Sequence, residues 1–143
     1  MLVKVLLLAS VLLVVNTVIH AMAMTLAIRW SRHIAGLHPS HPFFPTGRPM
    51  VVSAVVLLMF FASVAEVMVW AVVYKWLGAF SEGEPAIYFS MVTYTTLGYG
   101  DIVLGENLRL LSSFQAAIGI IMFGWTTAVV LAVVQRLYQN RSD

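Results

Sequence analysis

The run from Thr96 to Asp101 reads TLGYGD and carries glycine at alternate positions, Gly98 and Gly100. A backbone that turns successive carbonyl oxygens toward one axis needs residues that adopt positive φ, and glycine does so without a Cβ clash. Thr96 adds a hydroxyl oxygen to the same line of acceptors. A stack of such oxygens can replace the hydration shell of a cation.

The composition places the elements around this run in a membrane. Hydrophobic residues make up 61% of the 143 residues and charged residues 10%, whereas soluble domains have about 45 to 50% and about 25%. The length allows one domain and leaves too few residues for a soluble enzyme core. The net charge of +2 comes from basic residues scattered at helix ends, which argues against nucleic acid as a partner. The lack of cysteine excludes disulfides and cysteine metal sites.

Three apolar stretches are long enough to cross a bilayer, which takes about 20 residues. They run from Leu2 to Ile28, from Val51 to Phe80 and from Leu108 to Leu137. Between the last two, the run from Pro85 to Thr95 would span only about 16 Å as a helix and is closed by the glycines. We therefore expect an all-α membrane protein with three transmembrane helices and a re-entrant helix between the second and third.

The re-entrant segment has start and end signals of its own. Pro85 suits the first turn of a helix, and Ser81 with Glu84 three residues later offers a capping box. Non-helical backbone at membrane depth is tolerated only inside protein or beside water. The segment from Thr96 to Gly100 is therefore predicted to line a pore.

The TLGYGD run resembles the TVGYG selectivity filter of the potassium channels, with Leu97 in place of the usual Val or Ile. The resemblance covers about residues 51–137 and is to the small bacterial type, whose pore domain has two helices. It implies passive K+ conduction by a homotetramer, since one chain supplies a quarter of the oxygen ring, and it implies no cofactor. The K+-binding residues that it implies are Thr96, Leu97, Gly98, Tyr99 and Gly100, with Asp101 at the filter mouth.

The predicted organisation has four parts. These are an extra N-terminal transmembrane helix over residues 1–29, a cytoplasmic connector rich in Pro and His over 30–50, the pore domain over 51–137 and a short cytoplasmic tail over 138–143. Within the pore domain, the resemblance implies an outer helix over 51–80, a pore helix over 85–95, the filter over 96–101 and an inner helix over 108–137.

The same resemblance implies side chains that support the filter and shape the pore. On the pore helix, the supporting residues are Tyr88, Phe89, Val92 and Thr95. The simplest bacterial potassium channels carry two tryptophans and an acidic residue there, whereas Phe89 cannot donate a hydrogen bond and Val92 cannot share a proton with Asp101. On the inner helix, Gly119 serves either as a bending glycine or as a site of close helix packing. The residues expected to face the cavity are Ile120, Phe123, Thr127 and Leu131.

Glu66 lies midway along the second apolar stretch, where a charge costs about 2.5 to 3.5 kcal/mol on insertion scales. It is therefore expected to be protonated or partnered. The antiparallel first helix would place Asn16 level with Glu66 and His20 one turn nearer the cytoplasm. Two interpretations stay open: this polar cluster docks the first helix and couples protonation to gating, or Glu66 is a neutral acid bonded to a backbone carbonyl or to Thr126.

Orientation follows from the excess of lysine and arginine in cytoplasmic segments. Arg29, Arg32 and Arg48 lie between the first and second apolar stretches, and Arg136 and Arg141 lie at the C-terminal end. The opposite side is acidic around the re-entrant segment. We expect a multi-pass protein of the plasma or inner membrane with its N-terminus outside and its C-terminus in the cytoplasm.

The sequence also limits the alternatives. No helix carries arginine at every third position, so we expect a leak-like channel or one tuned by lipid, pH or a separate regulatory subunit. A haem-binding subunit would need paired histidines in the membrane, and only His20 lies there. The loop residues His33, His38 and His41 are either a metal or pH site or, more simply, solvated. The competing functions are a weakly selective cation channel and a non-conducting or regulatory subunit with a vestigial filter.

Overall fold

The computed structural model describes residues 2–35 and 44–139. These residues form four helices and no strand, which confirms the all-α prediction. The helices are α1 (Leu2–Ala35), α2 (Phe44–Trp76), α3 (Gly83–Tyr94) and α4 (Arg109–Gln139). Three of them are long and apolar enough to cross a membrane, over Leu2–Ile34, Gly47–Trp76 and Arg109–Tyr138. At 12 residues, α3 is about 18 Å long and falls short of the roughly 30 Å hydrocarbon core.

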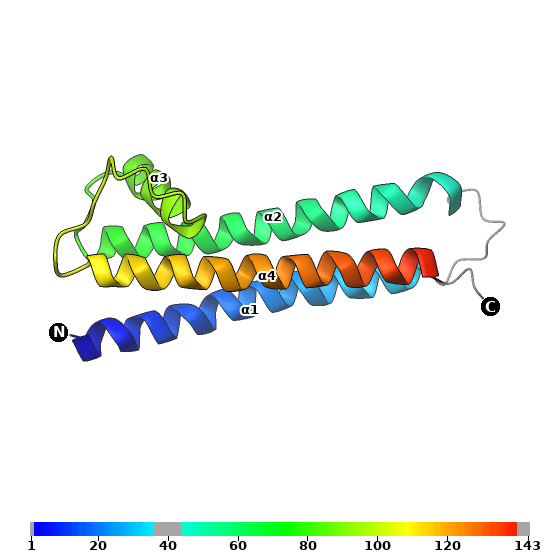
Figure 1. Cartoon of the computed structure of the whole chain (residues 1–143), viewed down its shortest axis with the longest axis horizontal. Helices are drawn as coiled ribbons and strands as arrows, with labels where there is room; N and C mark the ends of the chain where they lie inside the picture. The colour runs from blue at the N-terminus through cyan, green and yellow to red at the C-terminus, as the bar shows by residue number, and fades with distance from the viewer. Residues whose placement is uncertain (1, 36–43, 140–143) are drawn as a thin grey trace.

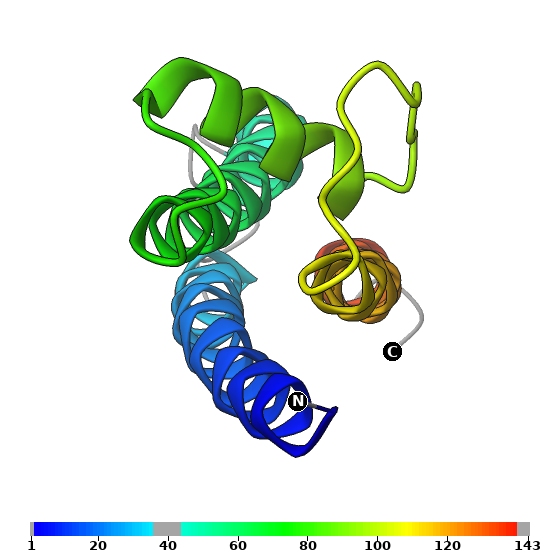
Figure 2. The ribbon, with the colours of Figure 1, turned by 90° about the vertical axis from the view of Figure 1, so that its left-hand side faces the viewer.

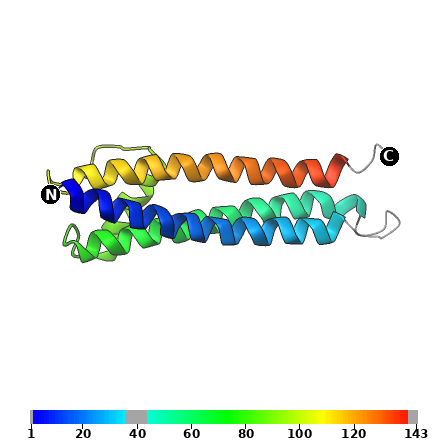
Figure 3. The same cartoon turned by 90° about the horizontal axis from the view of Figure 1, so that it is seen from below.

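The three long helices run side by side, with α3 and the filter loop at the end where the N-terminus lies (Figures 1 and 3). The described part of α4 ends at the opposite end of the bundle. Viewed along the bundle, α3 crosses over α2 toward α4, while α1 lies on the other side of these two helices (Figure 2). Both α1 and α3 pack against α2 and α4, but within the described residues no Cα atom of α1 lies within 8 Å of one in α3.

The predicted connector is wrong at both of its ends. Residues 30–35 continue α1, and residues 44–50 already belong to α2, so the segment between the two helices narrows to 36–43. Pro45 fits because it lies in the first turn of α2, where its missing N–H would have had no helical acceptor. His33 lies in the last turn of α1, whereas His38 and His41 lie outside the described residues.

The second helix ends at Trp76, four residues before the predicted end at Phe80, because Gly78 closes it. Gly78 adopts φ +75°. Its amide donates to the Lys75 carbonyl at 3.0 Å, and the Ala79 amide donates to the Tyr74 carbonyl at 3.0 Å. This pair of bonds is a Schellman motif, which favours glycine at its left-handed position.

The re-entrant helix covers Gly83–Tyr94 instead of residues 85–95, and the predicted capping box is wrong. The N-cap residue is Glu82, whose side chain makes no capping hydrogen bond. Glu84 lies in the first turn, where its negative charge interacts favourably with the positive end of the helix dipole. The last helix extends two residues beyond its predicted end at 137, so part of the predicted tail is helical.

Candidate functional site

The segment from Thr96 to Asp101, predicted to be the filter and called the filter segment below, alternates in backbone handedness. Thr96, Gly98 and Gly100 adopt φ of +60°, +52° and +78°, whereas Leu97 and Tyr99 between them stay outside the left-handed region. The expectation that Gly98 and Gly100 enter positive φ is confirmed. Thr96 was not predicted to do so, and a β-branched residue in this region is a strained outlier of the kind found at functional sites.

Backbone hydrogen bonds tie the start of the filter to the last turn of α3. The amides of Leu97 and Gly98 donate to the Val92 carbonyl at 3.0 and 3.3 Å. The Thr96 amide donates to the Thr93 carbonyl at 3.0 Å. Val92 therefore supports the filter through its carbonyl oxygen and not through its side chain. A displacement of the last turn of α3 would move the filter with it.

A side-chain hydrogen bond joins the Asp101 end of the filter segment to α3. The Tyr88 hydroxyl donates to Asp101 Oδ2 at 2.6 Å, and the Ile102 amide donates to Asp101 Oδ1 at 3.0 Å. The bond from Tyr88 holds the pKa of the Asp101 carboxyl below its ordinary value. Tyr88 thus anchors the filter mouth in a chain that lacks an acidic residue at position 92.

The ring contacts of Phe89 and the hydrogen bond of the Thr95 hydroxyl join these two predicted support residues to partners outside the filter segment. Phe89 is buried, and the centroid of its ring lies 5.3 Å from the ring centroid of Tyr74 and 5.5 Å from that of Phe80. The Thr95 hydroxyl donates to the Met91 carbonyl at 2.9 Å, within its own helix turn. Phe89 therefore fixes α3 to the bundle, and the Thr95 side chain caps the last turn.

A buried polar network holds the middle of α3 to both of its neighbours. The Ser90 hydroxyl donates to the Val67 carbonyl of α2 at 2.8 Å. Gln115 of α4 donates through Nε2 to the Ser90 hydroxyl at 2.8 Å, and its Oε1 accepts from the Tyr74 hydroxyl at 2.8 Å. Sequence reasoning missed this network, although a glutamine inside an apolar membrane span was a signal that could have found it.

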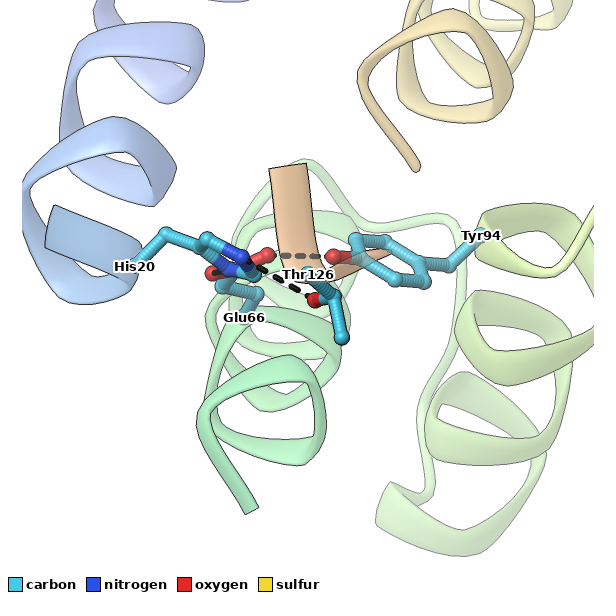
Figure 4. Close-up of polar contacts among 4 residues, drawn as sticks. All are labelled: His20, Glu66, Tyr94 and Thr126. Carbon is cyan, nitrogen blue, oxygen red and sulfur yellow. Dashed lines mark hydrogen bonds and ion pairs between the residues drawn. The ribbon is translucent and has the colours of Figure 1, made fainter. Parts of the chain in front are cut away.

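A second polar cluster joins all four helices (Figure 4). His20 Nδ1 of α1 lies 2.9 Å from Glu66 Oε1 of α2, and His20 Nε2 lies 3.1 Å from Thr126 Oγ1 of α4. The Tyr94 hydroxyl of α3 donates to the other oxygen of Glu66. His20 and Glu66 are fully buried, and the His20 ring stacks on Trp125 with its centroid 5.7 Å away.

A comparison with protein families matches residues 62–136 to the family described as Ion channel. The matched segment is more than half of the chain and contains residues 62–76 of α2, all of α3, the segment from Thr96 to Asp101 and most of α4. The chain belongs to the ion channel family. No curated protein and no solved structure matched the chain. The family and the three apolar helices make it a multi-pass membrane protein, and the family favours transport over enzymatic chemistry.

The cluster in this channel differs from the predicted one in its partners. His20 bonds Glu66, as one open interpretation required, and Thr126 bonds His20 instead of Glu66. Of the two residues of α1 placed near Glu66, only His20 contacts it: Asn16 is buried, and neither of its side-chain polar atoms has a partner among the described residues. Tyr94 was missed because its approach depends on how the re-entrant helix packs.

Gly119 of the channel lies where α4 meets the end of α3. A Cβ on Gly119 would stand 2.0 Å from the Tyr94 carbonyl oxygen. This close approach explains the glycine as a packing residue, the second of the two predicted interpretations. Further along α4, the predicted cavity residues Ile120, Phe123, Thr127 and Leu131 are exposed on the single chain.

Removal of the Tyr88 hydroxyl should reveal the anchor at the filter mouth through its pH dependence. A lowered pKa for Asp101 in the folded channel means that the bond stabilises the fold fully above the unfolded value of about 3.9. This stabilisation is lost as the pH falls through the folded value. Tyr88→Phe should therefore lower the melting temperature in detergent at pH 6, and the difference from the wild type should begin to shrink below about pH 3.9 and close once the pH is below the folded pKa of Asp101.

The matched control for this anchor is the same substitution in an Asp101→Asn background. Asparagine accepts a hydrogen bond but has no carboxyl to titrate, so Tyr88→Phe should then cost the same at every pH. A melting difference in the Asp101 background that stays constant from pH 6 to pH 3 would show that Tyr88 does not stabilise the carboxylate.

Proposed function

We propose that this ion channel is potassium-selective and conducts K+ passively through a filter formed by residues 96–100. The observation that carries the proposal is the alternation of positive φ at Thr96, Gly98 and Gly100 in a non-helical segment tied to a re-entrant helix. Such a backbone can present successive carbonyl oxygens to one side, where they replace the water around K+. Asp101 lies at the mouth of this filter, and K+ is the transported ion, not a cofactor.

Four copies of the chain would complete the pore. One copy supplies a quarter of the oxygen ring, and it leaves large apolar side chains exposed beside the filter and along α4. Leu97 and Tyr99 are 55% and 67% exposed, and Ile120 is 61% exposed. A homotetramer in a lipid membrane would cover part of this surface and turn the α4 face toward a central cavity. The negative ends of four α3 dipoles would then favour a cation there.

The charge distribution supports one orientation in the membrane. Arg29, Arg32, Arg48 and Arg136 belong to the end of the bundle opposite the filter. Because cytoplasmic segments carry the excess of basic residues, this end faces the cytoplasm and the filter mouth faces outside. The N-terminus then lies outside and the C-terminus inside, in a plasma or inner membrane. No voltage-sensing arginine series occurs in the described helices, which favours a leak-like channel or control by lipid, pH or a partner subunit.

Flux from liposomes tests the proposal directly. Purified protein in vesicles loaded with K+ should dissipate a K+ gradient, and equal Na+ gradients should decay much more slowly. Native mass measurement in mild detergent should give four chains. Equal K+ and Na+ flux would instead indicate a weakly selective cation channel, and a folded tetramer without flux would indicate a non-conducting subunit.

A further inference from the structure

The first helix is linked to the end of α3 by a chain of hydrogen bonds as well as by the apolar core. Within the described residues, no Cα atom of α1 lies within 8 Å of one in α3, because α2 and α4 lie between the two helices (Figure 2). The side chains of His20, Glu66 and Tyr94 bridge this separation, since Glu66 bonds His20 with one oxygen and Tyr94 with the other (Figure 4). A single carboxyl group thus links two helices whose backbones do not pack directly against each other.

Tyr94 is well placed to transmit this link to the filter. It is the last residue of α3, and the next two residues are Thr95 and the strained Thr96. Its ring packs edge-on against Phe123 of α4 at 5.5 Å, and its hydroxyl is the group that Glu66 holds. The amides of Thr96, Leu97 and Gly98 bond to the same last turn of α3. The position of Tyr94 therefore sets the position of the filter entrance, by which we mean the Thr96 end of the filter segment.

Every hydrogen-bonding group of His20 and Glu66 has a partner when a single proton lies between His20 Nδ1 and Glu66 Oε1. Either an imidazolium faces a carboxylate or a neutral imidazole faces a carboxylic acid, and in both states the pair has no net charge. In both states the Tyr94 hydroxyl donates to Glu66 and His20 Nε2–H donates to Thr126. A charge-neutral, fully bonded group is the form that a fully buried site within the membrane favours.

From this geometry we infer that His20 and Glu66 are positioning residues for ion selectivity, through which α1 holds Tyr94 and the filter entrance in place. The inference rests on the proposed potassium conduction. It gives the first helix, which lies outside the segment matched by the family, a function in the pore. A filter that discriminates between cations must hold its oxygens to within a fraction of an ångström, so loss of one link is expressed as lost selectivity.

The test compares the ratio of K+ to Na+ flux in liposomes for full-length variants. Tyr94→Phe removes the hydroxyl and keeps the ring on Phe123, and His20→Ala removes the contribution of α1. Each should lower the ratio about fivefold, the population change that one lost buried hydrogen bond produces. Glu66→Gln should keep the wild-type ratio, because its amide can donate to His20 Nδ1 and its carbonyl can accept from Tyr94.

Two controls separate positioning from general destabilisation. Leu12→Ala weakens the packing of α1, since Leu12 is buried two turns from His20, but leaves the hydrogen bonds in place. It should lower the melting temperature and keep the flux ratio. The double variant of His20→Ala with Tyr94→Phe should be no less selective than the poorer single variant, because both changes break one chain.

The outcomes distinguish the inference from the function on which it rests. A wild-type protein that conducts no K+ would overturn the proposed function and the inference with it. A selective wild type with equally selective Tyr94→Phe and His20→Ala variants would overturn the inference alone. An equal loss of selectivity in Leu12→Ala, or multiplied losses in the double variant, would also overturn it.

Discussion

Gly98→Ala is expected to abolish potassium flux through the channel. The added methyl group would meet no atom within 4 Å, so the effect comes from the backbone and not from crowding. Gly98 adopts φ +52°, and an L-residue in the left-handed region costs about 1 to 2 kcal/mol. In the proposed tetramer the cost is roughly 4 to 8 kcal/mol for the ring, which is enough to favour another conformation of the filter.

Gly105→Ala is the matched control for the filter substitution. Gly105 lies just after the filter, has open space around its Cα and does not adopt positive φ. It should keep K+ flux at the wild-type level under the same vesicle conditions. Tyr99→Phe, which loses a hydroxyl but leaves the backbone unchanged, should also retain much of the flux. Normal K+ selectivity in Gly98→Ala would contradict the proposed filter.

The sequence was a sufficient guide where structure depends on local chemistry. Long apolar stretches predicted three spans, and the glycine spacing predicted the positions of left-handed backbone at Gly98 and Gly100. Element ends were less predictable because they depend on details such as proline in a first turn. Residues 44–50 were predicted to belong to the connector, but they are helical because proline is tolerated in the first turn of a helix. The second helix was predicted to continue to Phe80, but the turn at Gly78 ends it at Trp76.

The polar contacts required knowledge of how the helices rotate and cross. Antiparallel register was enough to bring the first helix to Glu66, but not to choose between Asn16 and His20, since both share one helix face. Only packing places His20 on Glu66 and leaves Asn16 without a partner among the described residues. Tyr94 lies 28 residues from Glu66 and comes from a helix that returns into the bundle, so no sequence period could predict their contact.

Gly119→Ala is expected to destabilise the folded channel and to reduce selective flux. The new Cβ would lie 2.0 Å from the Tyr94 carbonyl oxygen, whereas such carbon and oxygen atoms approach to about 3.3 Å. The end of α3 and the α4 backbone must therefore separate by roughly 1 Å. Overpacking of this kind costs about 1 to 3 kcal/mol. Since the amides at the start of the filter donate hydrogen bonds to carbonyls in the same turn of α3, the filter entrance moves as well.

The sign of the stability change separates the two interpretations of Gly119. If Gly119 is only a bending glycine in a continuous helix, its replacement by alanine should raise the stability of the folded channel by about 0.5 to 1 kcal/mol, because alanine is the better helix former. Close packing against Tyr94 predicts the opposite sign. Gly124→Ala is the control, since a Cβ on Gly124, in the same helix, would meet no atom within 4 Å on the single chain. The melting temperature of Gly119→Ala should therefore lie below that of the wild type, and the melting temperature of Gly124→Ala should equal or exceed it. A Gly119→Ala channel with a raised melting temperature would favour the bending interpretation.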